Sequence, residues 1–145
     1  MVGLKFTANS SLVNGLAALS VELREAHLLE ALHEAAEPVR QAMASGATRG
    51  DEAPHIADNI VVSRVRKLGG FKLGDHEGHA AVAIGPKKGF AYALPLEYGW
   101  IHHPDGKSQP ARPFARPAFE STKAQALHTI GRVLWALLSS RGRAR

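Results

Sequence analysis

Hydrophobic positions in the first third of the chain repeat with the spacing of a helix. Between Ser10 and Gly46 they recur every three or four residues wherever they follow one another closely: Leu12, Leu16, Leu19, Leu23, Leu32, Ala35, Val39 and Met43. This period places them on one helical face. We expect two helices, about 11–19 and 21–45, the second starting at Ser20. Pro38 lacks the amide that would bond back to residue 34, which predicts a kink or a break there.

The pattern changes to that of β-strands in the middle of the chain. Residues 59–67 are rich in β-branched side chains, and Ala80, Val82 and Ile84 form an alternating run that closes at Gly85. Both features are typical of strands. We expect the two runs to pair as an antiparallel hairpin with a long, mobile loop over 68–78.

The last third predicts a short element, a loop and a long helix. Residues 90–99 are too apolar for an exposed loop and suit a short helix or turn, whereas 100–111 are rich in Pro, Gly, His and Asp and predict a surface loop. A long helix opens at 113–117, since proline is tolerated in a first turn. Its expected core stripe is Phe119, Ala126, Ile130, Val133, Leu134 and Leu137, broadened by Trp135 and Leu138.

Together these elements predict an α+β fold in a single domain over residues 1–145, with an N-terminal helical arm, a small antiparallel sheet and a long C-terminal helix packed on the sheet. The basic tail, 139–145, is expected to be flexible. The absence of cysteine excludes thiol catalysis, Cys-ligated zinc and disulfides. No apolar run approaches the roughly 18 residues needed to cross a bilayer, so we expect no membrane partner.

Charge is distributed unevenly along the chain. Residues 1–60 carry four basic and eight acidic side chains, whereas 61–145 carry 14 basic and five acidic ones. This asymmetry is typical of a nucleic-acid partner, or of subunits whose acidic and basic faces meet in an assembly. Arg64, Arg66 and Lys67, with Lys87, Lys88 and the terminal arginines, are candidates for contact with DNA phosphates. Aromatic residues make up only 6% of the chain, however, and show no stacking pattern.

Motifs for catalysis or metal binding are weak. His102, His103 and Asp105, with Glu97 nearby, are ligand types without a metal-site spacing, and 75–79 offers only His-x-x-His in a turn. Residues 85–89 lack the order of a phosphate-binding loop, and no Gly-x-Ser-x-Gly elbow occurs. We therefore expect no enzyme activity, no cofactor and no metal.

Two neighbouring motifs carry a resemblance to a known family. The first comprises Tyr92-Ala93 and Glu97-Tyr98-Gly99, and the second is the run 112–118, Arg-Pro-Phe-Ala-Arg-Pro-Ala. Together they resemble the HK-ninety-seven gene-product-ten-like tail-component proteins of long-tailed phages. The order of the remaining elements is similar over about residues 10–140. One departure is the segment 55–58, His-Ile-Ala-Asp, where the family usually has a Thr-Gly-x-Leu turn.

The resemblance implies a structural virion protein of the phage neck or upper tail, a tail completion or head–tail joining subunit that assembles in the host cytoplasm as a ring of its own copies. A hexamer, contacts with other neck and tail proteins, and DNA in the channel are implied as well. The residues expected at structural contacts and interfaces are Tyr92, Glu97, Tyr98, Gly99, Arg112, Pro113, Phe114, Arg116 and Pro117.

Within these motifs we expect Glu97 to pair with Arg116, and Phe114 and Phe119 to anchor the contact, either inside the chain or to an adjacent copy. Two other functions stay open. One is a tail terminator or head-closure ring protein. The other belongs to a different class, a small cytosolic nucleic-acid-binding protein that uses Arg64, Arg66, Lys67 and the basic tail.

Overall fold

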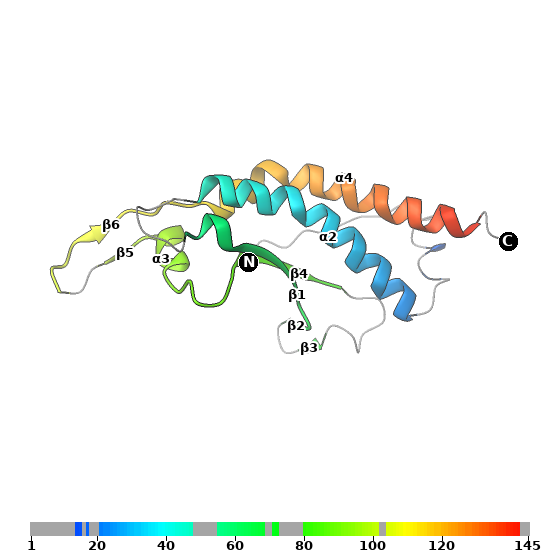
Figure 1. Ribbon diagram of the computed structural model, residues 1–145, viewed down its shortest axis with the longest axis horizontal. Helices are drawn as coiled ribbons and strands as arrows, with labels where there is room; N and C mark the ends of the chain where they lie inside the picture. Colours follow the sequence, from blue (N-terminus) through cyan, green and yellow to red (C-terminus); the bar gives the residue numbers. More distant parts are fainter. Residues whose placement is uncertain are drawn as a thin grey trace. The chain divides into compact units, whose positions relative to one another are not determined.

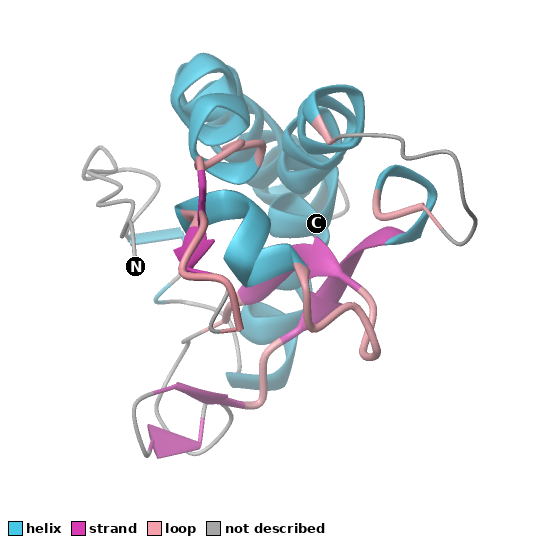
Figure 2. Ribbon diagram, turned by 90° about the vertical axis from the view of Figure 1, so that its left-hand side faces the viewer, coloured by secondary structure: helices cyan, strands magenta, loops and turns pink. Residues whose placement is uncertain are grey.

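The computed structural model describes residues 14, 15, 17, 21–47, 55–68, 71–72, 80–101 and 104–142. Helices dominate and the strands are short (Figure 1 and Figure 2). The α+β class is confirmed. The elements in chain order are α2 (Val21–Gly46), the 3-10 turn η1 (Ala57–Asn59), β1 (Ile60–Arg64), β2 (Lys67–Leu68), β3 (Phe71–Lys72), β4 (Val82–Pro86), α3 (Ala93–Tyr98), β5 (Trp100–Ile101), β6 (Ser108–Gln109) and α4 (Ala115–Gly142).

The chain divides into two compact units. Unit 1 comprises residues 1–35, 64–83 and 124–145, and unit 2 comprises 36–63 and 84–123. Each long helix therefore contributes one part to each unit.

In unit 1 the first turns of α2 lie beside the last turns of α4 (Figure 1). The helical periodicity of both segments supplies a shared apolar core, made of Ala31, Val133 and Leu134 with Leu28, Ile130, Leu137 and Leu138 around it. Two ion pairs flank this core, Glu34 with Arg132 and Glu25 with Arg64. Both pairs are substantially exposed to solvent, so the apolar contacts dominate the stability of the helix pair.

In unit 2 the buried apolar side chains come from the end of α2, from the η1 region, from the first residue of α3 and from the start of α4. They are Ala36, Val39, Met43, Ala47, Ile56, Ala57, Ile60, Ala93, Phe114 and Ala118. The end of α2 approaches Phe114 closely, because a Cβ added to Gly46 would lie 3.6 Å from the Phe114 carbonyl oxygen. Residues 55–58, where the resembled family usually has a different turn, lead into the 3-10 turn η1. Ile56 in this segment is only 2% exposed.

The described strands form three two-stranded sheets, β1 with β4, β2 with β3 and β5 with β6. The Val65 amide donates to Ala81 at one end of the β1–β4 pair and the Lys87 amide donates to Asn59 at the other. Because the later residue of one strand bonds to the earlier residue of the other at each end, the two strands run antiparallel, as predicted from the two β-rich runs. In the small β2–β3 pair, Lys67 ends the run expected as a strand, whereas Leu68, Phe71 and Lys72 lie in the region expected to be only a loop. Residues 69–70 and 73–78 of that loop lie outside the described residues.

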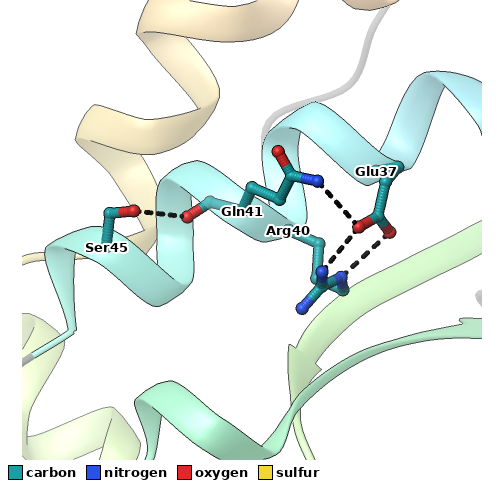
Figure 3. Close-up of polar contacts among 4 residues, drawn as sticks. All are labelled: Glu37, Arg40, Gln41 and Ser45. Carbon is teal, nitrogen blue, oxygen red and sulfur yellow. Dashed lines mark hydrogen bonds and ion pairs between the residues drawn. The ribbon is translucent and has the colours of Figure 1, made fainter.

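Of the two outcomes predicted at Pro38, a kink or a break, the break is wrong, because α2 continues through the proline as one helix of 26 residues. Side-chain contacts link Glu37 to the next turn of the helix, on the C-terminal side of the missing backbone bond (Figure 3). The Glu37 carboxylate accepts hydrogen bonds from Arg40 at 2.5 and 2.9 Å and from Gln41 at 3.1 Å. The Arg40 bonds, with help from Gln41, lower the pKa of Glu37 to about 2. Burial of Ala35, Ala36 and Val39 around the proline holds both sides of the helix together.

Other sequence expectations are also corrected. The predicted surface loop at 100–111 contains the β5–β6 hairpin, because Trp100 and Ile101 pair with Gln109 and Ser108. Helix α4 continues to Gly142, into the tail expected to be flexible. Trp135 is 53% exposed and does not join the core stripe. The predicted start at Ser20 and residues 143–145 lie outside the described residues.

Candidate functional site

Most of the sequence-predicted contact residues meet where α3 ends and α4 begins. We call this arrangement the α3–α4 clasp and define it by Glu97, Gly99, Arg112, Phe114, Ala115 and Arg116. All of these residues belong to unit 2. The hydrogen bonds of the clasp are made largely by main-chain amide and carbonyl groups.

Helix α3 ends at Gly99, whose amide donates to the Pro95 carbonyl at 2.7 Å. Gly99 has φ 78° and ψ 166°, a conformation that is essentially restricted to glycine. A Cβ at this position would lie 2.8 Å from the Gln109 carbonyl oxygen and 3.0 Å from the Ala111 amide nitrogen. Glycine is therefore required here both by the backbone conformation and by the close approach of the returning chain.

Glu97 lies in the last turn of α3 and its carboxylate binds the start of α4. Its Oε2 accepts from the Phe114 amide at 2.8 Å and the Ala115 amide at 3.0 Å, and its Oε1 accepts from the Arg116 amide at 3.1 Å. The side chain is only 9% exposed. A buried carboxylate is thus held by three main-chain donors that a helix start leaves without intrahelical partners.

The prolines of the second motif complete this arrangement. A helix start has four amide groups without an intrahelical partner, here those of residues 114–117. Glu97 accepts from the first three, and the fourth residue, Pro117, has no amide hydrogen. Every donor of the first turn of α4 is thereby satisfied or absent. This explains why a glutamate in one motif is combined with Phe-Ala-Arg-Pro in the other.

Burial opposes ionisation of Glu97, but the hydrogen bonds from Ala115, Phe114 and Arg116 outweigh it. With a smaller contribution from the Arg116 charge, they lower the pKa of Glu97 below its ordinary value of 4.5. Glu97 is therefore ionised near neutral pH. Because its carboxylate is engaged by three amides, it is arranged for anchoring and not for proton transfer.

Two further contacts hold the clasp. The Arg112 amide donates to the Leu96 carbonyl at 2.7 Å, which joins the returning chain to α3. The Phe114 side chain is 4% exposed, as expected for an anchor. Pro113 and Pro117 are exposed and act through the backbone.

The expected pairing of Glu97 with the Arg116 side chain is corrected by the structure. Glu97 binds the Arg116 amide, while the Arg116 guanidinium lies over the ring of Tyr98, 5.6 Å from its centre. The amides of a helix start converge on one point, so they hold a carboxylate better than a single flexible side chain does. Sequence reasoning found the right segments but not the atoms, because main-chain donors leave no signature in residue identity.

The remaining predicted residues lie apart from the clasp or at its surface. Tyr92 is 46% exposed, and the centre of its ring lies 5.8 Å from the centre of the Phe90 ring. Arg64 pairs with Glu25 in unit 1, and Arg66 is exposed. Lys67 begins β2, and its side chain lies outside the described part of the chain. The candidate DNA-facing residues Arg64, Arg66 and Lys67 belong to unit 1, whereas the clasp belongs to unit 2.

Sequence reasoning missed an exposed apolar surface beside the clasp. Leu94, Trp100 and Ile101 are 69%, 40% and 62% exposed. The apolar composition of 90–99 predicts a short helix or turn but does not indicate which of its side chains are exposed. The one available signal was the occurrence of Trp100 and Ile101 at the start of a segment otherwise rich in polar and turn-forming residues.

No cluster of three or more potential metal ligands occurs among the described residues. The histidine candidates 102–103 and 75–79 lie outside them. Within the described part of the chain, no helix is long and apolar enough to cross a membrane. Comparisons of the chain with protein-family models, with curated proteins and with solved structures find no match.

Proposed function

We propose that this protein is a ring-forming structural subunit of the neck or upper tail of a long-tailed phage, acting in tail completion or head–tail joining. The supporting resemblance rests on two motifs separated by a loop. Such subunits act by binding other proteins, so their characteristic residues are expected to shape contacts and not to transform a substrate.

The observation that carries the proposal is that the two motifs form one structural device. Glu97 of the first motif binds the amides of Phe114, Ala115 and Arg116 of the second. Gly99 and the prolines have specific roles in the same clasp. A shared structural role explains the co-occurrence of these residues at this spacing.

Charge contributes less to contacts between copies than the sequence suggests. The acidic residues Glu25, Glu34 and Glu37 of α2 each pair with an arginine of the same chain. Among the α2 acids whose side chains the structure describes, Glu30 alone has no such partner. These paired charges of α2 therefore contribute little to contacts between copies in the proposed ring.

The test is to interrupt the gene in the phage that encodes it and to examine the particles by electron microscopy. We expect filled heads and separate tails that do not join, and restoration of joining when the purified protein is added. The purified protein is expected to form a closed oligomer by native mass spectrometry, with six copies as the expected number. Normal, infectious particles without this polypeptide would refute the proposal.

The nucleic-acid-binding alternative retains one supporting observation. Arg66 is exposed, and no acidic side chain in the described chain pairs with it. Such a protein would bind duplex DNA with an affinity that falls steeply with salt concentration. Tight, salt-sensitive DNA binding by a monomer or dimer that forms no ring would favour this alternative over the virion role.

A further inference from the structure

Exposed large hydrophobic side chains are concentrated in one short stretch. Seven are exposed among the described residues, and five of these lie between positions 92 and 101. We call these five the apolar patch: Tyr92, Leu94, Tyr98, Trp100 and Ile101. All five belong to unit 2. Clustered exposed apolar side chains of this kind mark interaction surfaces, whereas isolated ones do not.

The patch is continuous along the chain, and Trp100 and Ile101, as neighbouring strand residues, present apolar side chains on both faces of the hairpin. Leu94 and Tyr98 are four residues apart on α3 and so share a helical face. Trp100 and Ile101 follow directly in the β5–β6 hairpin, which extends beyond α3 (Figure 1). Strands of two residues with both faces exposed have little intrinsic stability. Coverage by a partner would stabilise the hairpin.

The charges near the patch are positive. Lys87 and Lys88 precede α3, and Arg112 and Arg116 follow the hairpin. All four side chains are exposed, and none pairs with an acidic side chain of the described chain. The two acids of the same region are engaged, Glu97 by main-chain amides and Asp105 by Lys107. The surroundings of the patch therefore complement an acidic partner.

Within the part of α2 whose side chains are described, the acids other than Glu30 pair within their own chain, so α2 of a second copy offers little acidic surface to meet these cations. Nucleic acid is a poor match for Leu94 and Ile101, because aliphatic side chains do not stack on bases as aromatic ones do. The remaining match is a different protein. Exposed Tyr and Trp beside Arg are the residue types that dominate binding energy at protein interfaces.

We propose that the apolar patch docks a different protein of the assembly, one whose contact face is apolar at its centre and acidic at its rim. This inference rests on the proposed function, and it names the surface that joins the ring to its neighbour in the particle. The contact with the neighbouring protein and the contact between copies are thus assigned to different surfaces. The clasp fixes the patch in place, since Tyr98 lies under Arg116 and Gly99 sets the direction of β5.

The test uses the double variant Leu94→Asp/Ile101→Asp, with Trp135→Asp as the matched control. Trp135 is also exposed, but it lies on α4 in unit 1. The probes are heads and tails purified from infections in which this gene is interrupted, mixed with each purified protein. We expect the double variant to reduce joining by about tenfold or more, as loss of interface anchors does. Its oligomeric mass and its melting temperature should stay those of the wild type, and the control should join normally.

Arg112→Glu is a second variant that preserves the backbone bond to Leu96. It should weaken joining, and added salt should reduce the joining activity of the wild type more than that of this variant. This variant also decides the matter if the aspartates disturb folding. Normal joining with both variants would overturn the proposal.

Three other results would overturn it in distinguishable ways. Loss of the oligomer in the folded double variant would make the occupant a second copy. Binding of a fluorescent dT20 oligonucleotide that the double variant abolishes would make it nucleic acid. Failure of the wild-type protein itself to restore joining would remove the proposed function and this inference with it.

Discussion

The α3–α4 clasp of unit 2 and the helix pair of unit 1 are stabilised by different means. The helix pair depends on interchangeable apolar contacts around Ala31, Val133 and Leu134. The clasp depends on individual groups, a carboxylate aimed at three amides and a glycine that no other residue can replace without strain. Packing tolerates substitutions of similar volume, whereas directed hydrogen bonds do not. Residue identity should therefore matter more in the clasp than in the helix pair.

The largest effect is expected at the glycine of the clasp. Gly99→Ala should destabilise the protein by about 4 kcal/mol, because it adds backbone strain and a Cβ 2.8 Å from a carbonyl oxygen. Gly106→Ala is the control, since Gly106 has φ 67° but open space around its Cβ position. It should cost about 1 kcal/mol. Urea unfolding of both variants measures the difference, and equal losses would show that the close approach at Gly99 is unimportant.

The helix pair should respond strongly to the loss of volume. Leu134 is 1% exposed, so Leu134→Ala should cost about 3 kcal/mol. Leu134→Met, which nearly conserves volume, should cost less than about 1.5 kcal/mol. Chemical denaturation provides both values. If Met proved as costly as Ala, the contacts of this core would be specific in the way that those of the clasp are, and the contrast between the regions would fail.

Glu97, unlike Leu134, should not tolerate even a replacement of nearly the same size. Glu97→Ala should cost about 2 to 3 kcal/mol, because it leaves the amides at the start of α4 without acceptors. The nearly isosteric Glu97→Gln should also destabilise, by about 1 to 2 kcal/mol, since its amide group presents a donor to another donor. Thermal and urea unfolding would check this. A Gln variant as stable as the wild type would mean that the carboxylate is not needed.

The smallest effect is the contribution of Glu97 to acid sensitivity. Its folded-state pKa lies below the ordinary 4.5, so the unfolded chain binds the proton more readily. This contribution to stability is fully present above pH 4.5 and is lost as the pH falls through the folded-state pKa. Unfolding free energies measured from pH 6 downward should decline less steeply for Glu97→Gln than for the wild type. Identical slopes would contradict the assignment.

Much of the fold could be predicted from the sequence. The helical period over 21–45, the two β-rich runs and the long last helix correspond to α2, β1, β4 and α4. The sequence also drew attention to Glu97, Gly99 and Phe114. These predictions succeed because backbone conformation is governed by local spacing and by the special geometry of glycine and proline.

Tertiary structure decided which atoms meet. It carried α2 through Pro38, left Trp135 exposed, paired Trp100 with Gln109 and replaced the expected Glu97–Arg116 side-chain pair with bonds to main-chain amides. A repeat along the chain indicates which side chains share a face, but it does not indicate which faces will be covered. Burial and hydrogen bonding depend on segments distant in sequence, and the amide that binds a carboxylate is the same in almost every residue.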